Sequence, residues 1–317
     1  MEIIQDDRGI FLSQEKYANK LIEKFGMNGS KSVSSPLTPN GKKIEEDGEY
    51  GEPTKFRSIV GGLLYICASR PDVMFASSYL SRYMSAPLMK HYQEAKRVLR
   101  YIKGTSNFGV LFTSVESPEL LGYSDSDWGG SVEDKKSTSG YVFTLGSGMF
   151  SWQSNKQQTV AQSTAEAEYI AVCAATNQAI WLQRLLEELG FKSQHGVPIY
   201  CDNKSAIAIV LRRRSSTRRS SNKGTWRVKV GFKSQHGVPI YCDNKSAIAI
   251  GKNPVQHRRT KHIEIKYHFV REAEHKGLIQ LKYCEGEVQL ADLLTKALGG
   301  SRFEELRRKL GVRPKLN

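Results

Sequence analysis

Apolar and polar positions in the first third of the chain predict a β-hairpin followed by helices. Residues 2–12 place the apolar runs "EII" and "IFL" on either side of the turn "DDRG". Ser13 is expected to cap a helix that ends at Gly26. Residues 27–55, rich in Ser, Pro, Gly and charge, predict a long loop. Further helices are predicted around "SIVGGLLYICA", from Pro71, and over "HYQEAKRVLRYIKGT".

From residue 118 the pattern predicts strands that alternate with helices. The strand "ELLGYSDSDW" ends in acids, and "SGYVFTL" and "GMFSWQS" form a hairpin around "GSG". A long helix is expected to start at the capping box of Ser163 and Glu166 and to stop at Gly190. Two more strands are predicted over "VPIYCD" and "LIQLKYC", and helices over "NKSAIAI", "RRTKHIEIKYHFVREAEHKG", "VQLADLLTKAL" and "SRFEELRRKL". The order β-β-β-α-β-α-β-α indicates an α/β fold, a mixed sheet with helices packed on it.

One stretch, "GFKSQHGVPIYCDNKSAIAI", occurs twice without a change, at residues 190–209 and 231–250. A structural repeat would have drifted and would recur more often. Only one copy can form the fourth strand of the sheet, so either Asp202 or Asp243 ends that strand. The second copy continues into "GKNP" and a basic helix, whereas the first runs into Arg- and Ser-rich sequence. This context favours Asp243.

Composition points to a partner that carries negative charge. The chain has 317 residues and a formal net charge of +15, which favours nucleic acid, with a merely basic protein as the alternative. Its five cysteines show no CxxC pair and no disulfide spacing, which predicts a reduced, intracellular chain. The first residues carry no signal pattern, and the run "IVGGLLYICA" is too short to span a bilayer, so no membrane partner is expected.

Acids stand where predicted strands end or helices begin. They are Asp125, Glu168, Asp202 or its duplicate Asp243, and Asp292. An antiparallel hairpin followed by a crossover helix can bring these positions to one edge of the sheet. Clustered carboxylates repel, and divalent cations offset that repulsion; oxygen-only ligands suit Mg²⁺ or Mn²⁺. Two such ions support phosphodiester hydrolysis.

Neighbouring acids and histidines have simpler explanations. Glu166 is the capping-box partner, and Asp127 is expected to be a turn residue. His257, His262 and His268 lack the cysteine or further-ligand spacing of a zinc site.

Two groups of basic residues could follow phosphates, although a solvated charged face is the alternative for each. The first lies at helical spacing and consists of Lys96, Arg97, Arg100 and Lys103. The second consists of Arg258, Arg259, Lys261 and His262.

The second half of the chain resembles the ribonuclease H domain of copia-type LTR retrotransposon Pol polyproteins. The matching pieces are "GYSDSDWGG", "KKSTSGYVFTLG", "SWQSNKQQTVAQSTAEAEYIA", "IYCDNKSAIAI", "RRTKHIEIKYHFVRE" and "ADLLTKAL". The first half resembles the end of the preceding reverse transcriptase, in "GIFLSQEKYANKLIEKFGM", "PLTPNGKK", "FRSIVGGLLYICASRPDVMFA" and "AKRVLRYIKGT". The resemblance covers nearly the whole chain, with the motifs in the family's order.

This resemblance implies two domains. Residues 1–112 would be a smaller α+β, thumb- or connection-like fragment of the reverse transcriptase, and residues 118–310 a ribonuclease H-like domain with a mixed five-stranded sheet. The resemblance places Asp125, Glu168, one of Asp202 or Asp243, and Asp292 on the family's D-E-D-D metal ligands.

Two departures from the family change the expected activity. The chain has no Tyr-x-Asp-Asp motif, so we expect no DNA synthesis from it alone. Deleting residues 210–250 joins "CDNKSAIAI" to "GKNPVQHRRTKH" and restores the family pattern, which indicates an aberrant insertion. The stretch between the two copies has a composition that favours disorder.

The function implied by the resemblance is Mg²⁺-dependent endonucleolytic cleavage of the RNA strand of RNA–DNA hybrids. The rest of the Pol polyprotein would be its partner, in cytoplasmic virus-like particles or in the nucleus. The alternative is an inactive relic that binds nucleic acid without cutting it. An integrase-type enzyme would need its Glu last among the ligands, whereas Glu168 comes second.

Overall fold

The computed structural model describes residues 1–39, 48, 52–191, 195–211 and 269–315. The second copy of the duplicated stretch therefore lies outside the described residues. So do Asp243 and the basic group Arg258, Arg259, Lys261 and His262.

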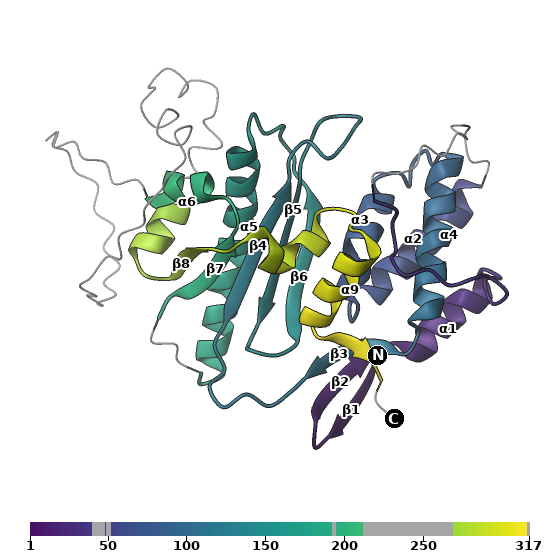
Figure 1. Cartoon of the computed structure of the whole chain (residues 1–317), viewed down its shortest axis with the longest axis horizontal. Coiled ribbons are helices and arrows are strands. Elements are labelled where there is room, and N and C mark those ends of the chain that lie inside the picture. Colours follow the sequence, from purple (N-terminus) through teal and green to yellow (C-terminus); the bar gives the residue numbers. More distant parts are fainter. Residues whose placement is uncertain (40–47, 49–51, 192–194, 212–268, 316–317) are drawn as a thin grey trace, which may run out of the picture.

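A five-stranded mixed sheet forms the centre of the second half (Figure 1). Its strands are β4 (Leu121–Asp127), β5 (Thr138–Thr144), β6 (Met149–Lys156), β7 (Val197–Cys201) and β8 (Ile279–Tyr283). They lie in the order β6-β5-β4-β7-β8, antiparallel from β4 through β6 and parallel from β4 through β8. This is the ribonuclease H-like architecture expected from the sequence, so the predicted fold class is confirmed.

Helix α5 (Thr164–Glu188) lies behind this sheet in Figure 1 and buries one side of it. Tyr169 and Val172 of α5 pack with Phe143, Ile199 and Ile279 of the strands in one apolar cluster. The predicted cap is present, because the Ser163 hydroxyl oxygen accepts a hydrogen bond from the backbone N–H of Glu166 at 3.2 Å. The short helix α6 (Lys204–Leu211) follows β7.

Residues 1–112 form helices and most of a second, four-stranded sheet. The sheet has the order β1-β2-β3-β9 and joins β1 (Glu2–Asp6), β2 (Gly9–Ser13), β3 (Phe108–Phe112) and β9 (Val312–Pro314). The helices are α1 (Glu15–Lys24), α2 (Pro53–Ile66), η1 (Pro71–Val73), α3 (Met74–Ser81) and α4 (Met89–Gly104). The hairpin β1–β2 was predicted; Ser13 ends β2 and does not cap α1, whose N-cap position is Gln14.

The segment after β8 differs most from the sequence prediction. The helix expected over "VQLADLLTKAL" is instead a pair of 3₁₀ turns, η3 (Gly286–Val288) and η4 (Leu290–Leu294). The Gln289 side chain accepts a hydrogen bond from the backbone N–H of Ala291 at 3.2 Å, and the hydroxyl of Thr295 donates to the Asp125 carboxylate. These two side-chain bonds tie both ends of η4 locally, which favours a short turn over a longer helix.

The C-terminal segment packs into the core of residues 1–112. Leu294 of η4, Phe303 and Leu306 of α9 (Gly300–Lys309), and Val312 of β9 belong to the same buried cluster as the helices α1 to α4. The division into two domains stays a prediction, but the segment that carries Asp292 contributes to both halves. No helix in the described part of the chain is long and apolar enough to cross a membrane.

Candidate active site

The parallel pairing of β4 and β7 brings two acids together at one edge of the sheet. Tyr123 of β4 pairs with Tyr200 of β7, so the C-terminal ends of the two strands lie side by side. Asp125 stands near the end of β4 and is 1% exposed, and Asp202 directly follows β7.

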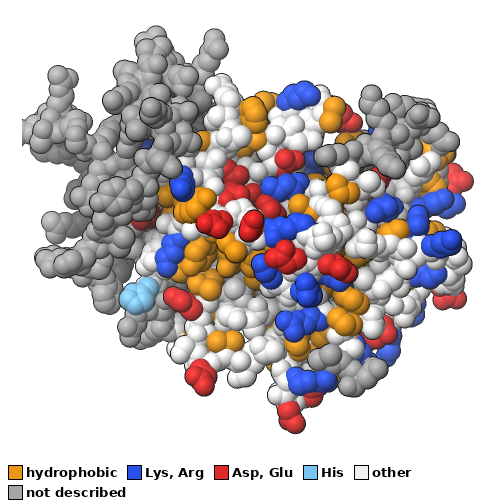
Figure 2. Space-filling model, viewed as in Figure 1, with side chains coloured by type: hydrophobic (Ala, Val, Ile, Leu, Met, Phe, Trp, Pro, Cys, Tyr) orange, Lys and Arg blue, Asp and Glu red, His pale blue; other side chains and the backbone are white. Residues whose placement is uncertain are grey.

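The other two predicted acids come from a helix and a 3₁₀ turn. Glu168 lies one turn inside α5 and accepts a hydrogen bond from the backbone N–H of Ser126 at 3.1 Å. Asp292 lies in η4, and both side chains are buried. Carboxylate oxygens of Asp125, Asp202 and Asp292 lie within 4.8 Å of one another. Figure 2 shows acidic side chains gathered near the middle of this face, beside Lys and Arg side chains.

The first copy of the duplicated stretch fills the strand position next to β4. Residues 197–201 form β7 between β4 and β8, so the fourth strand ends at Asp202, whereas the sequence context favoured Asp243. The first copy reaches this position from α5 through the short link 189–196, which makes pairing with β4 local. The structure therefore differs from the sequence expectation at this strand, and Asp243 lies outside the described residues.

Burial and mutual repulsion shift the titration of these acids. Burial raises the pKa of Asp125 to about 7; the nearby ammonium of Lys296 lowers it, and Asp292 and Asp202 raise it further. Burial, followed by the charges of Asp125 and Asp202, raises the pKa of Glu168 well above its usual value. The pKa of Asp202 is raised too, first by burial. The cluster thus resists full ionisation unless cations are present.

Residues that sequence reasoning missed hold the acids in place. The Thr295 hydroxyl donates to the Asp125 carboxylate, and the Gln289 amide donates to the Ser124 backbone carbonyl at 2.9 Å, which ties η4 to β4. Lys296 Nζ is 2.8 Å from Asp292 Oδ1. The available signal was their spacing, because Thr295 and Lys296 follow Asp292 by three and four residues.

A cleft of about 410 Å³ opens beside these acids. It is lined by Asp202, Gly286, Glu287, Asp292, Lys296, Arg302 and Glu305. Arg302 donates to the backbone carbonyls of Gly286 and Glu287 at 2.8 and 2.6 Å, which fixes one wall of the cleft. The cleft gives a ligand from solvent access to Asp202 and Asp292.

The donor set fits a hard divalent cation. Asp125, Glu168, Asp202 and Asp292 offer carboxylate oxygens, which Mg²⁺ and Mn²⁺ prefer. Cys201 lies beside Glu168 and Asp202, but burial raises the pKa of its thiol well above the usual value. Its sulfur therefore stays protonated, and the oxygens remain the ligands.

The basic face of α4 contacts the protein's own chain. Arg100 Nε donates to the Lys31 carbonyl at 2.7 Å, Arg97 donates to the Ser35 hydroxyl at 3.3 Å, and Lys103 donates to the Asn28 and Ser30 carbonyls. Lys96 lies over the Tyr92 ring, with its Nζ 5.1 Å from the ring centre. Contact of these residues with nucleic acid stays a prediction.

Comparison with known proteins identifies the family. Over 306 residues the chain is 34% identical to a retrovirus-related Pol polyprotein from transposon RE2 of Arabidopsis thaliana, and over 324 residues it is 34% identical to that from transposon TNT 1-94 of Nicotiana tabacum. These alignments cover 96% and 98% of the chain. The chain belongs to the copia-type Pol polyproteins.

The Pol segment spans only 18% and 21% of the length of those two relatives. It is also 47% identical over 128 residues to the secreted RxLR effector protein 161 of Plasmopara viticola, covering 40% of the segment and 90% of that protein. No protein-family model matches the chain.

Solved structures similar to the Pol segment include LC11-RNase H1 in complex with an RNA/DNA hybrid, at 13% identity and a TM-score of 0.31. That match covers 56% of the segment and 94% of the solved chain. The foamy viral protease-reverse transcriptase in complex with an RNA/DNA hybrid matches at 9% identity and a TM-score of 0.44, over 90% of the segment and 28% of that chain.

Proposed function

We propose that this Pol segment is a Mg²⁺-dependent ribonuclease H, which cuts the RNA strand of RNA–DNA hybrids endonucleolytically. The observation that carries the proposal is the convergence of four carboxylates, from β4, α5, the end of β7 and η4, at one edge of the sheet. The membership of the chain in the Pol polyproteins supports it.

The metal ligands would be Asp125, Glu168, Asp202 and Asp292. Two bound Mg²⁺ or Mn²⁺ ions would supply an activated water and stabilise the leaving oxygen. The chain's own part is to hold these side chains still: the Ser126 N–H fixes the Glu168 carboxylate. The strand to be cut would be chosen through its 2′-hydroxyl groups and the shape of the hybrid.

The partners in this proposal are the RNA–DNA hybrid and the rest of the Pol polyprotein. The cleft beside Asp202 and Asp292 provides an opening at which a phosphodiester can meet the site. The formal net charge of +15 favours approach of a polyanion.

Cleavage of an end-labelled hybrid with and without Mg²⁺ tests this proposal. We expect Asp125→Asn and Glu168→Gln each to reduce the cleavage rate by on the order of 10²-fold or more, because loss of a metal ligand removes several kcal/mol of transition-state stabilisation. Hybrid binding should persist in both variants.

Matched controls come from the same elements. Asp127→Asn changes an acid of β4, and Glu166→Gln changes the glutamate whose carboxylate accepts from the Gln162 N–H at 2.8 Å. Both should cut at the wild-type rate. Normal cleavage by Asp125→Asn or Glu168→Gln would refute the assignment.

The duplication supports a second candidate, a relic that binds hybrids without cutting them. Residues 210–250 separate α6 from the rest of the chain, where the family pattern is continuous. Hybrid binding with no Mg²⁺-dependent cleavage by the unaltered chain would favour the relic.

A further inference from the structure

One basic side chain lies within the carboxylate cluster. Lys296 Nζ is 2.8 Å from Asp292 Oδ1 and 3.7 Å from Asp125 Oδ2. Those two acids, with Asp202, form the trio whose oxygens lie within 4.8 Å of one another. Arg302 also approaches the cluster, with Nη2 3.7 Å from Asp292 Oδ2. The ammonium of Lys296 thus contacts two of the proposed metal ligands at once.

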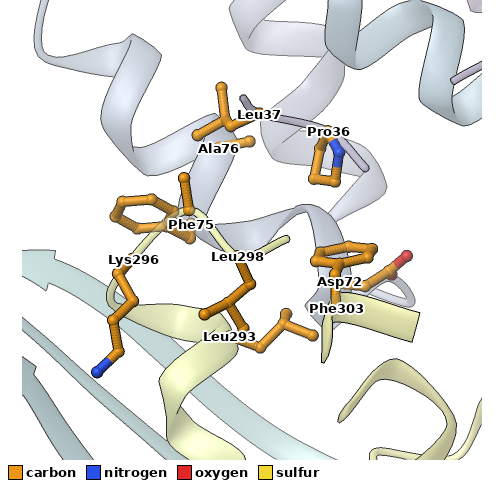
Figure 3. A pocket seen from close by; sticks show the side chains of 10 residues that line it. Pro36, Leu37, Asp72, Phe75, Ala76, Leu293, Lys296, Leu298 and Phe303 are labelled. Carbon is orange, nitrogen blue, oxygen red and sulfur yellow. The ribbon is translucent and has the colours of Figure 1, made fainter. Parts of the chain in front are cut away.

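The carbon chain of Lys296 is seated between the two halves of the molecule. It lines a small pocket together with Leu37, Phe75 and Ala76 of the N-terminal region and Leu298 of its own segment. Figure 3 shows the amine pointing away from these side chains, toward the strands of the sheet. A lysine whose stem is packed on apolar groups has fewer positions for its ammonium. The N-terminal region therefore helps to aim this charge.

An ammonium and a divalent ion that use the same oxygen repel each other. Mg²⁺ binds carboxylate oxygens at about 2.0–2.1 Å and tolerates little distortion of its shell. An ion bound to Asp125 and Asp292 would meet the Lys296 ammonium, which is hydrogen-bonded at 2.8 Å to the same Asp292 side chain. The ammonium has to move aside before that ion can bind.

We infer that Lys296 is a built-in counter-ion, which holds the carboxylates together without metal and competes with one of the two divalent ions for Asp125 and Asp292. The inference rests on the proposed function. It means that the two ions bind with unequal affinity. The ion that uses Asp292 must displace a charge already present, so it binds more weakly.

Mn²⁺ binding followed by electron paramagnetic resonance tests the inference on the full chain. Lys296→Met removes the charge and keeps an apolar stem of similar length, while Lys296→Arg keeps the charge. We expect Lys296→Met to bind the weaker Mn²⁺ roughly fivefold to tenfold more tightly, the effect of removing one partly buried competing charge. Its melting temperature without metal should fall by several degrees, and Lys296→Arg should remain close to wild type.

Lys156→Met is the matched control, because Lys156 also pairs with a carboxylate, Asp134, at 2.7 Å but away from the cluster. Its Mn²⁺ affinity should equal that of wild type. Phe75→Leu, which loosens the seat of the Lys296 stem, should shift Mn²⁺ affinity in the same direction as Lys296→Met and by less.

Two results would overturn the inference, and they are distinguishable. If wild type binds two Mn²⁺ and Lys296→Met binds them no more tightly, the competition is refuted while the proposed function stands. If Asp125→Asn binds Mn²⁺ as wild type does, the metal site itself is refuted, and the role of Lys296 falls with it.

Discussion

At the scale of single residues, Asp125 shows how burial and crowding act on one carboxylate. It is 1% exposed, accepts from Thr295 and has three charged neighbours in the cluster, and its pKa is raised to about 7. Metal ligands must be deprotonated, so ion binding at neutral pH would release protons from this site. The acid is costly to keep without a cation, which is the property expected of a group retained for its chemistry.

The candidate acids could be predicted because each stands at an element boundary that local sequence defines. Asp125 and Asp202 end strands with clear apolar patterns, and Glu168 follows a capping box. The choice between the two copies could not be predicted, because their strand and acid are identical. Lys296 was missed because its role depends on the fold of a segment 170 positions after Asp125 in the chain, where no periodicity marks it (296 − 126 = 170, counting from Ser126, the residue bonded to Glu168).

The two copies can be separated by one substitution in each. We predict that Asp202→Asn reduces hybrid cleavage by on the order of 10²-fold, because Asp202 occupies the cluster, while Asp243→Asn retains the wild-type rate. Parallel cleavage assays of the two variants measure this. Loss of cleavage only in the Asp243 variant would show that the second copy forms the working strand. Retained cleavage in both would show that the copies substitute for each other.

At the scale of elements, the strands of the central sheet and α5 were predictable from alternation and capping. The strands β3 and β9 were not, because each is short and its partner lies far away in sequence: Val110 pairs with Val312. The turn η4 was predicted as a longer helix, because its apolar residues fit a helical stripe. Tertiary contacts of Gln289 and Thr295 decide its form, and sequence periodicity does not contain them.

Helix α4 offers a prediction that divides its basic face in two. Arg100 and Lys103 donate to backbone carbonyls of residues 28–31, whereas Lys96 and Arg97 make no such backbone bond among those described. We predict that the double variant Lys96→Gln, Arg97→Gln lowers the magnitude of the log–log salt slope of hybrid binding by up to about 1.8, at ~0.9 per phosphate contact.

The companion double variant, Arg100→Gln with Lys103→Gln, should instead lower the melting temperature and leave the slope within error, because it releases the loop that follows α1. Binding titrations between about 50 and 200 mM salt and thermal melts separate the two outcomes. An unchanged slope in the first variant would mean that this face does not reach phosphate.

At the scale of the whole molecule, a buried polar network joins three elements. Arg70 forms two hydrogen bonds with Asp72, at 2.9 and 2.7 Å; Tyr101 donates to Asp72 at 2.5 Å, and Arg307 of α9 donates to the Tyr101 hydroxyl at 3.2 Å. Burial alone would raise the pKa of Asp72, but the charge and hydrogen bonds of Arg70 and the bond from Tyr101 outweigh it, so the pKa is lowered. The network links η1 and α4 to the segment that follows the site.

We predict that Asp72→Asn destabilises the protein by about 3–5 kcal/mol at pH 7, because it leaves the buried Arg70 charge unpaired. The folded-state pKa of Asp72 is depressed. Its contribution is therefore present above the unfolded-state pKa of about 3.9 and is lost as the pH falls through the folded-state value. The difference in melting temperature between wild type and Asp72→Asn should shrink below about pH 4.

Thermal melts from pH 7 to pH 3 measure this difference. Asp134→Asn, which removes an exposed pair with Lys156, should change the melting temperature little at any of these pH values. A gap between wild type and Asp72→Asn that stays constant down to pH 3 would contradict the assignment of the effect to this carboxylate.

The pairing of β3 with β9 has a consequence for the order in which the molecule can form. Strand β9 lies some two hundred residues after β3, and the η4 turn that carries Asp292 also comes late in the chain. A ribosome must have made the chain through residue 314 before the four-stranded sheet can close. Contacts of such long sequence separation form slowly, because the chain loses much entropy before they are made. A nascent chain therefore carries most of its acids before it can assemble them, and gains its cutting geometry only as one of the last events of folding.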